Sequence, residues 1–149
     1  MAFGRQLQLK LIRNFIFLLL LSILFSACSG QGTSGSVHGR SGSYYRDDEG
    51  GQAEVHFDSI NGTYYESFEI SIKNDDVVQV DLEASVGKGR VRVFLKGPQD
   101  EVSEVLIAPG QPGKLSGLAA VWSNETFHIY FEALDGEAGD IFYSVHYTY

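Results

Sequence analysis

The residues best suited to bind a cation are acidic side chains in a glycine-bearing segment near the C-terminus. Asp135, Glu137 and Asp140 are interleaved with Gly136 and Gly139. Calcium is held by several oxygen ligands, and glycine permits the tight backbone that a calcium loop needs. The spacing differs from that of an EF-hand loop, and Asp-Gly is also the sequence of a plain hairpin turn, which we favour. These three acids are therefore candidate calcium ligands within a predicted turn.

Aromatic side chains are the candidates for binding a ligand by stacking, because an aromatic ring can stack on a sugar ring. Several aromatic residues are predicted to lie on outer strand faces or beside turns: Tyr44, Tyr45, Tyr64, Tyr65, Phe94, Trp122, Tyr130 and Phe142. Of these, the candidate ligand-binding residues are Tyr64, Tyr65, Trp122 and Tyr130. The alternative, which we favour, is that some of these rings pack beneath loops.

The sequence has no evident constellation for catalysis. It lacks a Gly-x-Ser-x-Gly motif, and a nucleophile needs a base and an orienting group. His128 and His146 fall on two strands predicted to pair, so they could approach each other, but zinc-site spacings are absent. Nineteen acidic residues leave open a carboxylate pair for glycoside hydrolysis, yet none lies in an apolar pocket signature. We expect a non-enzymatic protein without a cofactor, and keep a hydrolase with an unrecognised carboxylate site as the alternative.

The single cysteine, Cys28, closes an apolar segment near the N-terminus. Basic residues precede this segment, and between residues 15 and 25 only Ser22 is polar. A membrane-spanning helix needs about 20 apolar residues, so the pattern is typical of a secretory signal. The residues Phe25-Ser26-Ala27-Cys28 resemble the lipobox of bacterial lipoproteins, with phenylalanine where leucine is usual.

The lipobox resemblance implies that residues 1–27 are removed and that the Cys28 thiol receives a lipid. The partner would then be a membrane, and the location the extracytoplasmic side of a bacterial cell envelope. Ser29 is not an acidic retention signal, so the resemblance favours the outer membrane of a host with two membranes. The alternatives are an uncleaved membrane helix and a plain secretory signal that happens to end in a cysteine.

A spacer is predicted to follow the cysteine. Residues 29–43 contain five Gly and five Ser, with one valine as the only sizeable apolar side chain. Such a composition cannot bury enough apolar surface to offset the entropy of ordering the chain. We therefore predict a flexible tether over residues 28–43 and a folded domain over residues 44–149.

The charge of the chain limits its partners. The net charge is −8, and the mature chain from residue 28 would carry 8 Lys and Arg against 19 Asp and Glu, a net charge of −11. Nucleic acids require a basic surface, so they are excluded as partners. A cell-envelope protein or a glycan remains as the expected partner.

Apolar residues recur at every second position from residue 52 onward, which is typical of strands. The predicted strands cover residues 53–58, 68–73, 78–83, 90–96, 102–108, 127–133 and 141–149. Residues 115–122 fit either a strand or one helical turn, and Asn61-Gly62 is the sequence of a hairpin turn. Arg90 and Arg92 are predicted to pair with acids of the neighbouring strand.

This pattern predicts an all-β fold, a single antiparallel β-sandwich or jelly roll of seven to eight strands. Residues 125–149 resemble the closing strands of pre-peptidase C-terminal-type β-sandwiches of secreted bacterial proteins, which implies the same fold. The expected function is that of a lipid-anchored, non-catalytic binding or accessory module. A carbohydrate-binding or calcium-binding domain is the alternative.

Overall fold

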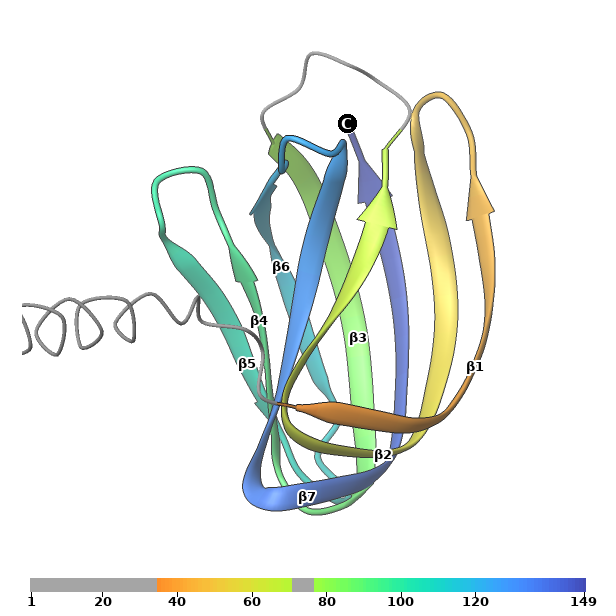
Figure 1. Ribbon diagram of the computed structural model, residues 1–149, viewed down its shortest axis with the longest axis vertical. Coiled ribbons are helices and arrows are strands. Elements are labelled where there is room, and N and C mark those ends of the chain that lie inside the picture. The colour runs from red at the N-terminus through yellow and green to blue at the C-terminus, as the bar shows by residue number, and fades with distance from the viewer. Residues whose placement is uncertain (1–34, 71–76) are drawn as a thin grey trace, which may run out of the picture. The chain divides into compact units, whose positions relative to one another are not determined.

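The computed structural model describes residues 35–70 and 77–149, and Figure 1 shows how their strands are arranged. The described part is all-β, which confirms the predicted fold class. Its seven strands are β1 (Ser36–Arg46), β2 (Gly50–Glu69), β3 (Val77–Lys88), β4 (Val91–Lys96), β5 (Val102–Ile107), β6 (Gly113–Ala120) and β7 (Thr126–Thr148). Within the described residues, no helix has the length and hydropathy to cross a membrane. The predicted signal and Cys28 lie outside the described residues.

The long strands β2 and β7 form the frame of the domain. They pair antiparallel along almost their whole lengths, from Gly50 opposite Thr148 to Glu69 opposite Thr126. Both strands curve back near their midpoints, as Figure 1 shows at the bottom of the view. Each of them therefore contributes to both layers of the sandwich.

One layer is the five-stranded sheet, in the order β1, β2 (residues 50–61), β7 (residues 137–148), β3 and β6. The other layer is the four-stranded sheet, in which residues 63–69 of β2 pair with residues 126–132 of β7, followed by β4 and β5. The apolar faces of the two sheets form the core between them. The ring of Phe57, from the five-stranded sheet, meets that of Phe131, from the four-stranded sheet, edge to face at 5.6 Å.

Aromatic rings join the two layers within a core that is otherwise built mainly of Val, Ile, Leu and Ala side chains. Phe127 stacks on Phe68 at 5.2 Å within the four-stranded sheet and meets Tyr147 of the five-stranded sheet at 4.9 Å. Burying a phenylalanine side chain stabilises a fold by roughly 1.5–3 kcal/mol. This aromatic packing therefore makes a large contribution to holding the two layers together.

Two predicted hairpin turns are wrong, because at each place a single strand bends from one layer to the other and pairs with the same neighbouring strand on both sides of the bend. Asn61-Gly62 lies inside β2, and Gly62 takes a positive φ of 68° where that strand passes between layers. The acidic segment from Asp135 to Asp140 lies inside β7. Between the pairs Asn61–Glu137 and Thr63–Glu132, β7 has four residues and β2 has one. The extra residues form an irregularity that bends the paired strands.

The predicted domain boundary at residue 44 is also wrong. Residues 36–43 belong to β1, which pairs with β2 from Ser36 opposite Asn61 onward. Main-chain pairing does not depend on apolar side chains, so a Gly- and Ser-rich sequence can form an edge strand. Val37 packs against the core and the side chain of Arg40 binds Glu66, which fixes the strand further.

The segment predicted to be either a strand or one helical turn is a strand, β6, over Gly113–Ala120.

The predicted pairing of Arg90 and Arg92 with acids of the neighbouring strand is confirmed. Arg90 binds Asp135 at 2.7 Å, and Arg92 lies 2.6 Å from Glu132 on β7. The guanidinium of Arg92 also approaches Glu104 on β5 at 3.3 Å.

Candidate functional site

A hollow lies on the outer face of the five-stranded sheet. Side chains alternate between core and solvent along a strand, so the polar residues of all five strands share this face. One row runs straight across the sheet, because its members are register partners: Ser43, Glu54, Ser144, Glu83 and Lys114. A second row lies beside it: Tyr45, Gln52, His146, Asp81 and Ser116. The two rows line a volume of about 770 Å³, here called the polar hollow.

Exposed aromatic rings lie at two positions along this face. Tyr45, on the edge strand β1, is 59% exposed and lines the polar hollow. Phe142, on β7, is 53% exposed and stacks on the imidazole of His56 at 4.1 Å. A ring held at the rim of a polar depression offers an apolar surface beside hydrogen-bonding groups.

The polar hollow is acidic. Lys114 forms an ion pair with Glu83, its register partner on β3. Neither Glu54 nor Asp81 forms an ion pair with any residue that the structure describes. Their carboxylates are acceptors for hydroxyl and amide donors, while Gln52 offers a donor and an acceptor. The hollow is therefore suited to a polar ligand rich in hydroxyl groups.

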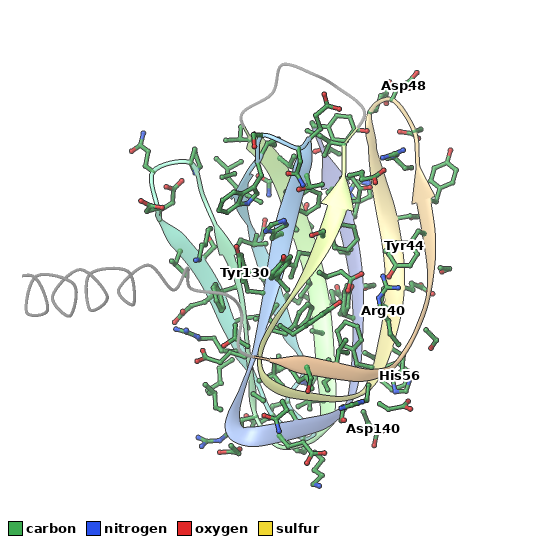
Figure 2. All side chains as sticks on the ribbon, viewed as in Figure 1. Arg40, Tyr44, Asp48, His56, Tyr130 and Asp140 are labelled. Atoms are coloured by element: carbon green, nitrogen blue, oxygen red, sulfur yellow. The ribbon has the colours of Figure 1, made fainter. Side chains whose placement is uncertain are left out.

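Three of the four predicted ligand-binding aromatics come together, but on the opposite face of the sandwich. Tyr65, Trp122 and Tyr130 lie on the outer face of the four-stranded sheet around His128. The imidazole of His128 stacks on Tyr65 at 4.5 Å and on Trp122 at 5.3 Å. Figure 2 shows Tyr130 on this side of the domain. Together with Phe94, these residues form the aromatic cluster.

Two rings of the aromatic cluster are buried, and they are covered by each other and by cationic side chains. Tyr130 stacks on Phe94 at 4.9 Å, and both are buried. The ammonium of Lys96 lies 4.9 Å from the Tyr130 ring, and the guanidinium of Arg92 covers Phe94. Burial, and secondarily Lys96, lowers the pKa of His128, whereas burial raises the pKa of Tyr130. Phe94 and Tyr130 are thus closed to a ligand, whereas Trp122 and Tyr65 are 49% and 38% exposed and each stacks on His128.

Tyr64, the fourth predicted aromatic, points the other way. Adjacent residues of a strand face opposite sides, so Tyr64 lies toward the core while Tyr65 faces solvent. Its ring meets Phe57 edge to face at 5.5 Å, and its hydroxyl donates to Glu66 at 2.8 Å. Burial raises the pKa of Tyr64, helped by this bond to the Glu66 carboxylate. Tyr64 therefore serves the interior of the domain.

The three candidate calcium ligands do not converge. The Arg90 guanidinium binds Asp135, which lowers the pKa of that carboxyl, and Glu137 lies in register with Asn61. Asp140 has its nearest described ionic partner in His56, 4.0 Å away. In residues 35–70 and 77–149, no group of three or more His, Cys, Asp and Glu side chains is placed to hold a metal.

His128 and His146, which could have met on paired strands, do not approach each other. The two belong to different halves of β7, so His128 lies on the outer face of the four-stranded sheet and His146 on that of the five-stranded sheet. The curvature of β7 separates them, and no sequence signal marks that strand as continuous.

The polar hollow contains residues that sequence reasoning passed over, above all Glu54, Glu83 and Ser144. Their alternation with apolar residues does place them on an outer face. Their meeting depends on register, which brings Glu54 and Glu83 to either side of Ser144. Only the order of the strands in the sheet reveals the site.

No family model matches the sequence, and neither does any curated protein. Among solved structures, the chain is similar to an oxalate oxidase in complex with glycolate, with 13% identity and a TM-score of 0.40 over 80% of this chain and 55% of the other. It is also similar to the family 11 carbohydrate-binding module of a Clostridium thermocellum cellulase, with 10% identity and a TM-score of 0.38 over 78% and 83% of the two chains.

A third similar structure is a carbohydrate-binding module of the Cellvibrio mixtus lichenase 5A in complex with cellotriose. The identity is 12% and the TM-score 0.37, over 76% of this chain and 89% of that module. The chain spans about half the length of the oxalate oxidase. These likenesses concern the fold alone.

Proposed function

We propose that the domain is a non-catalytic glycan-binding module that uses the polar hollow. The observation that carries this proposal is a depression of about 770 Å³ lined by polar side chains from five strands, with the exposed ring of Tyr45 at its rim. Ligand sites combine a concave surface with a few convergent polar groups.

The chemistry of a sugar matches this lining. A sugar presents hydroxyl groups that both donate and accept hydrogen bonds, and it also has a face of C–H groups. Glu54 and Asp81 can accept hydroxyl hydrogen bonds, and Ser144 between Glu54 and Glu83 can donate or accept them. The C–H face of the sugar would stack on Tyr45.

The setting of the carboxylates supports binding over hydrolysis. A glycosidase needs one carboxylic acid that stays protonated because apolar surroundings raise its pKa. Glu54 and Asp81 are exposed, and Glu83 is bound to Lys114. None of these three acids has the apolar enclosure that the acid role requires.

Calorimetric titration with neutral oligosaccharides of glucose, N-acetylglucosamine, mannose and galactose tests the proposal. Replacing Tyr45 by alanine should weaken binding roughly two- to twelvefold, because a stacked ring contributes about 0.5–1.5 kcal/mol. Tyr65→Ala is the matched control, since it removes an exposed tyrosine from the opposite sheet. Absence of binding to every sugar, or a loss confined to Tyr65→Ala, would overturn the proposal.

We also propose that the domain is displayed on a membrane through a lipid on Cys28, which lies outside the described residues. The lipobox-like residues before Cys28 support this proposal. The intact mass of the membrane-extracted protein, wild type beside Cys28→Ala, tests it. Loss of residues 1–27 together with a lipid-sized addition, both absent from the variant, is expected. An unmodified full-length mass would refute the anchor.

A further inference from the structure

The polar hollow is the middle part of a longer depression. A second hollow, of about 550 Å³, shares Glu54, Glu83 and Ser144 with it and extends to His56 and Phe142. A third hollow, of about 210 Å³, shares other lining residues with the polar hollow and extends in the opposite direction to Thr148. The three hollows are therefore continuous on one face of the sheet, and together they are called the ribbon groove.

The ribbon groove runs along the strands and not across them. Its floor follows the outward residues of β7, which are Thr148, His146, Ser144 and Phe142 in succession. At about 3.3 Å per residue, the six steps from Thr148 to Phe142 span roughly 20 Å. A monosaccharide would occupy only part of this length.

We propose that the ligand of the ribbon groove is an extended glycan chain that lies along β2 and β7, with several sugar units bound in line. This inference rests on the proposed glycan-binding function and adds the shape and direction of the ligand. The chain would stack on Tyr45 in the polar hollow and on Phe142 further along, and Ser144 lies between these two rings in the sequence of outward positions.

The side chains at the two stacking positions are suited to separate sugar units. Phe142 is braced from one side by the His56 imidazole at 4.1 Å, which holds its ring in place without covering both faces. Tyr45 of β1 lies level with His146 of β7, because Tyr45 pairs with Gln52 and Gln52 pairs with His146. His146 and Phe142 are four residues apart on β7. This offset corresponds to roughly 13 Å along the strand direction. One sugar ring cannot reach both positions, so a chain is required to use them together.

A length series of oligosaccharides tests the inference. Glucose, cello-oligosaccharides of two to six units, and N-acetylglucosamine oligomers of the same lengths are titrated into the purified protein. We expect the affinity for one of the two series to rise at least tenfold between the disaccharide and the hexasaccharide. Equal affinity for mono- and hexasaccharide would overturn the extended-chain inference while leaving glycan binding intact. Binding to no member of these series, nor to mannose or galactose oligosaccharides of the same lengths, would overturn both.

Variants locate the chain within the ribbon groove. Phe142→Ala should weaken the hexasaccharide at least threefold and leave the disaccharide unchanged, whereas Tyr45→Ala should weaken both. Trp122→Ala, on the opposite sheet, should weaken neither. Ser144→Tyr fills the middle of the groove from an exposed position, and it should abolish the gain in affinity with length. Retention of that gain in Ser144→Tyr, with an unchanged melting temperature, would place the chain elsewhere and refute the inference.

Discussion

The guanidinium of Arg40 binds the carboxylate of Glu66 across the open edge between the two sheets. Arg40 lies on β1 at the edge of the five-stranded sheet, and Glu66 lies on the part of β2 that forms an edge of the four-stranded sheet. The Arg40 Nε is 3.3 Å from Glu66 Oε2, and a second contact joins Arg40 Nη2 to Oε1. Figure 2 shows Arg40 and Tyr44 together on this edge. Glu66 is only 3% exposed, so the pair closes the sandwich from inside.

Replacing Glu66 by glutamine should destabilise the domain. The Arg40 guanidinium would lose its carboxylate, and the hydroxyls of Tyr44 and Tyr64 would lose a charged acceptor. Breaking a fully buried ion pair costs about 3–5 kcal/mol, but the Arg40 side chain is partly solvated, so we expect about 1–3 kcal/mol. Urea unfolding followed by circular dichroism measures the change.

Glu69→Gln is the matched control for this prediction. Glu69 belongs to the same strand and pairs with Arg46 of β1 at 3.3 Å, but both side chains are exposed. An exposed ion pair contributes about 0–1 kcal/mol. Equal losses in the two variants would show that burial of Glu66 is not what matters.

Gly39→Ala should also destabilise the domain, although residue 39 lies in the segment that its composition marks as a tether. Gly39 has a positive φ of 61°, and a Cβ there would lie 1.8 Å from the carboxylate of Asp58. The left-handed conformation alone costs roughly 1–2 kcal/mol for a residue with a Cβ. Ser41→Ala, on an exposed position of the same strand, is the control. If Gly39→Ala unfolds at the same urea concentration as the wild type, β1 is not an integral strand.

The pH dependence of stability should carry a contribution from His128. Burial and Lys96 hold the pKa of the folded-state His128 below its ordinary value of about 6.5, so the unfolded chain binds more protons near pH 6. His128 thus contributes stability that is fully present above about pH 6.5 and is lost as the pH falls toward its folded pKa. The melting temperature should fall more between pH 7.5 and 5 in the wild type than in His128→Gln.

The fluorescence of Trp122, the single tryptophan, provides a local measurement of the same titration. Its indole stacks on the His128 ring at 5.3 Å, so protonation of the imidazole should quench its emission. The midpoint is expected below pH 6.5 and should be absent from His128→Gln. His146→Gln, which changes a histidine on the opposite face, should leave the quenching curve unchanged. A midpoint above pH 6.5 would contradict the predicted direction.

The alternation of apolar residues was enough to predict an all-β sandwich, because period two follows from strand geometry whatever the topology. The same alternation did not predict where β2 and β7 bend from one layer to the other. Asn61-Gly62 has the sequence of a hairpin turn, and the same tolerance of positive φ at Gly62 serves a strand that passes from one layer to the other. Local propensity cannot distinguish the two outcomes, since the pairing with β7 decides between them.

The same limit applies to the candidate site. Alternation along a strand places Tyr64 and Tyr65 on opposite faces only if one strand runs through both residues. The hairpin predicted at Asn61-Gly62 left these two tyrosines beside a turn, so their faces could not be assigned. Glu66 would be expected on a solvent-facing position by its charge, yet it lies inside because Arg40 and two tyrosines satisfy it. The rows of the polar hollow depend on the order and register of five strands. The alternation of residues within a single strand carries no information about that order.

The charge of the polar hollow predicts which glycans it rejects. Glu54 and Asp81 have no described ionic partner and would face the ligand directly. Like charges in a partly desolvated hollow repel more strongly than in bulk water. Oligogalacturonate should therefore bind at least tenfold more weakly than a neutral oligosaccharide of equal length, as measured by calorimetry at low ionic strength.

Neutralising the carboxylates of Glu54 and Asp81 should reduce the difference in affinity between the neutral oligosaccharide and oligogalacturonate. In the double variant Glu54→Gln/Asp81→Asn, repulsion of the uronate is removed while the amides still offer hydrogen bonds. Added salt should have a similar effect on the wild type, since exposed charges are screened beyond about 8–10 Å at 0.1–0.15 M. Glu137→Gln/Asp100→Asn changes the net charge equally, at residues outside the lining of the ribbon groove. If this control narrows the affinity difference between neutral and acidic oligosaccharides as much as Glu54→Gln/Asp81→Asn does, the net charge of the domain causes that difference. If only Glu54→Gln/Asp81→Asn narrows it, the carboxylates of the polar hollow cause it.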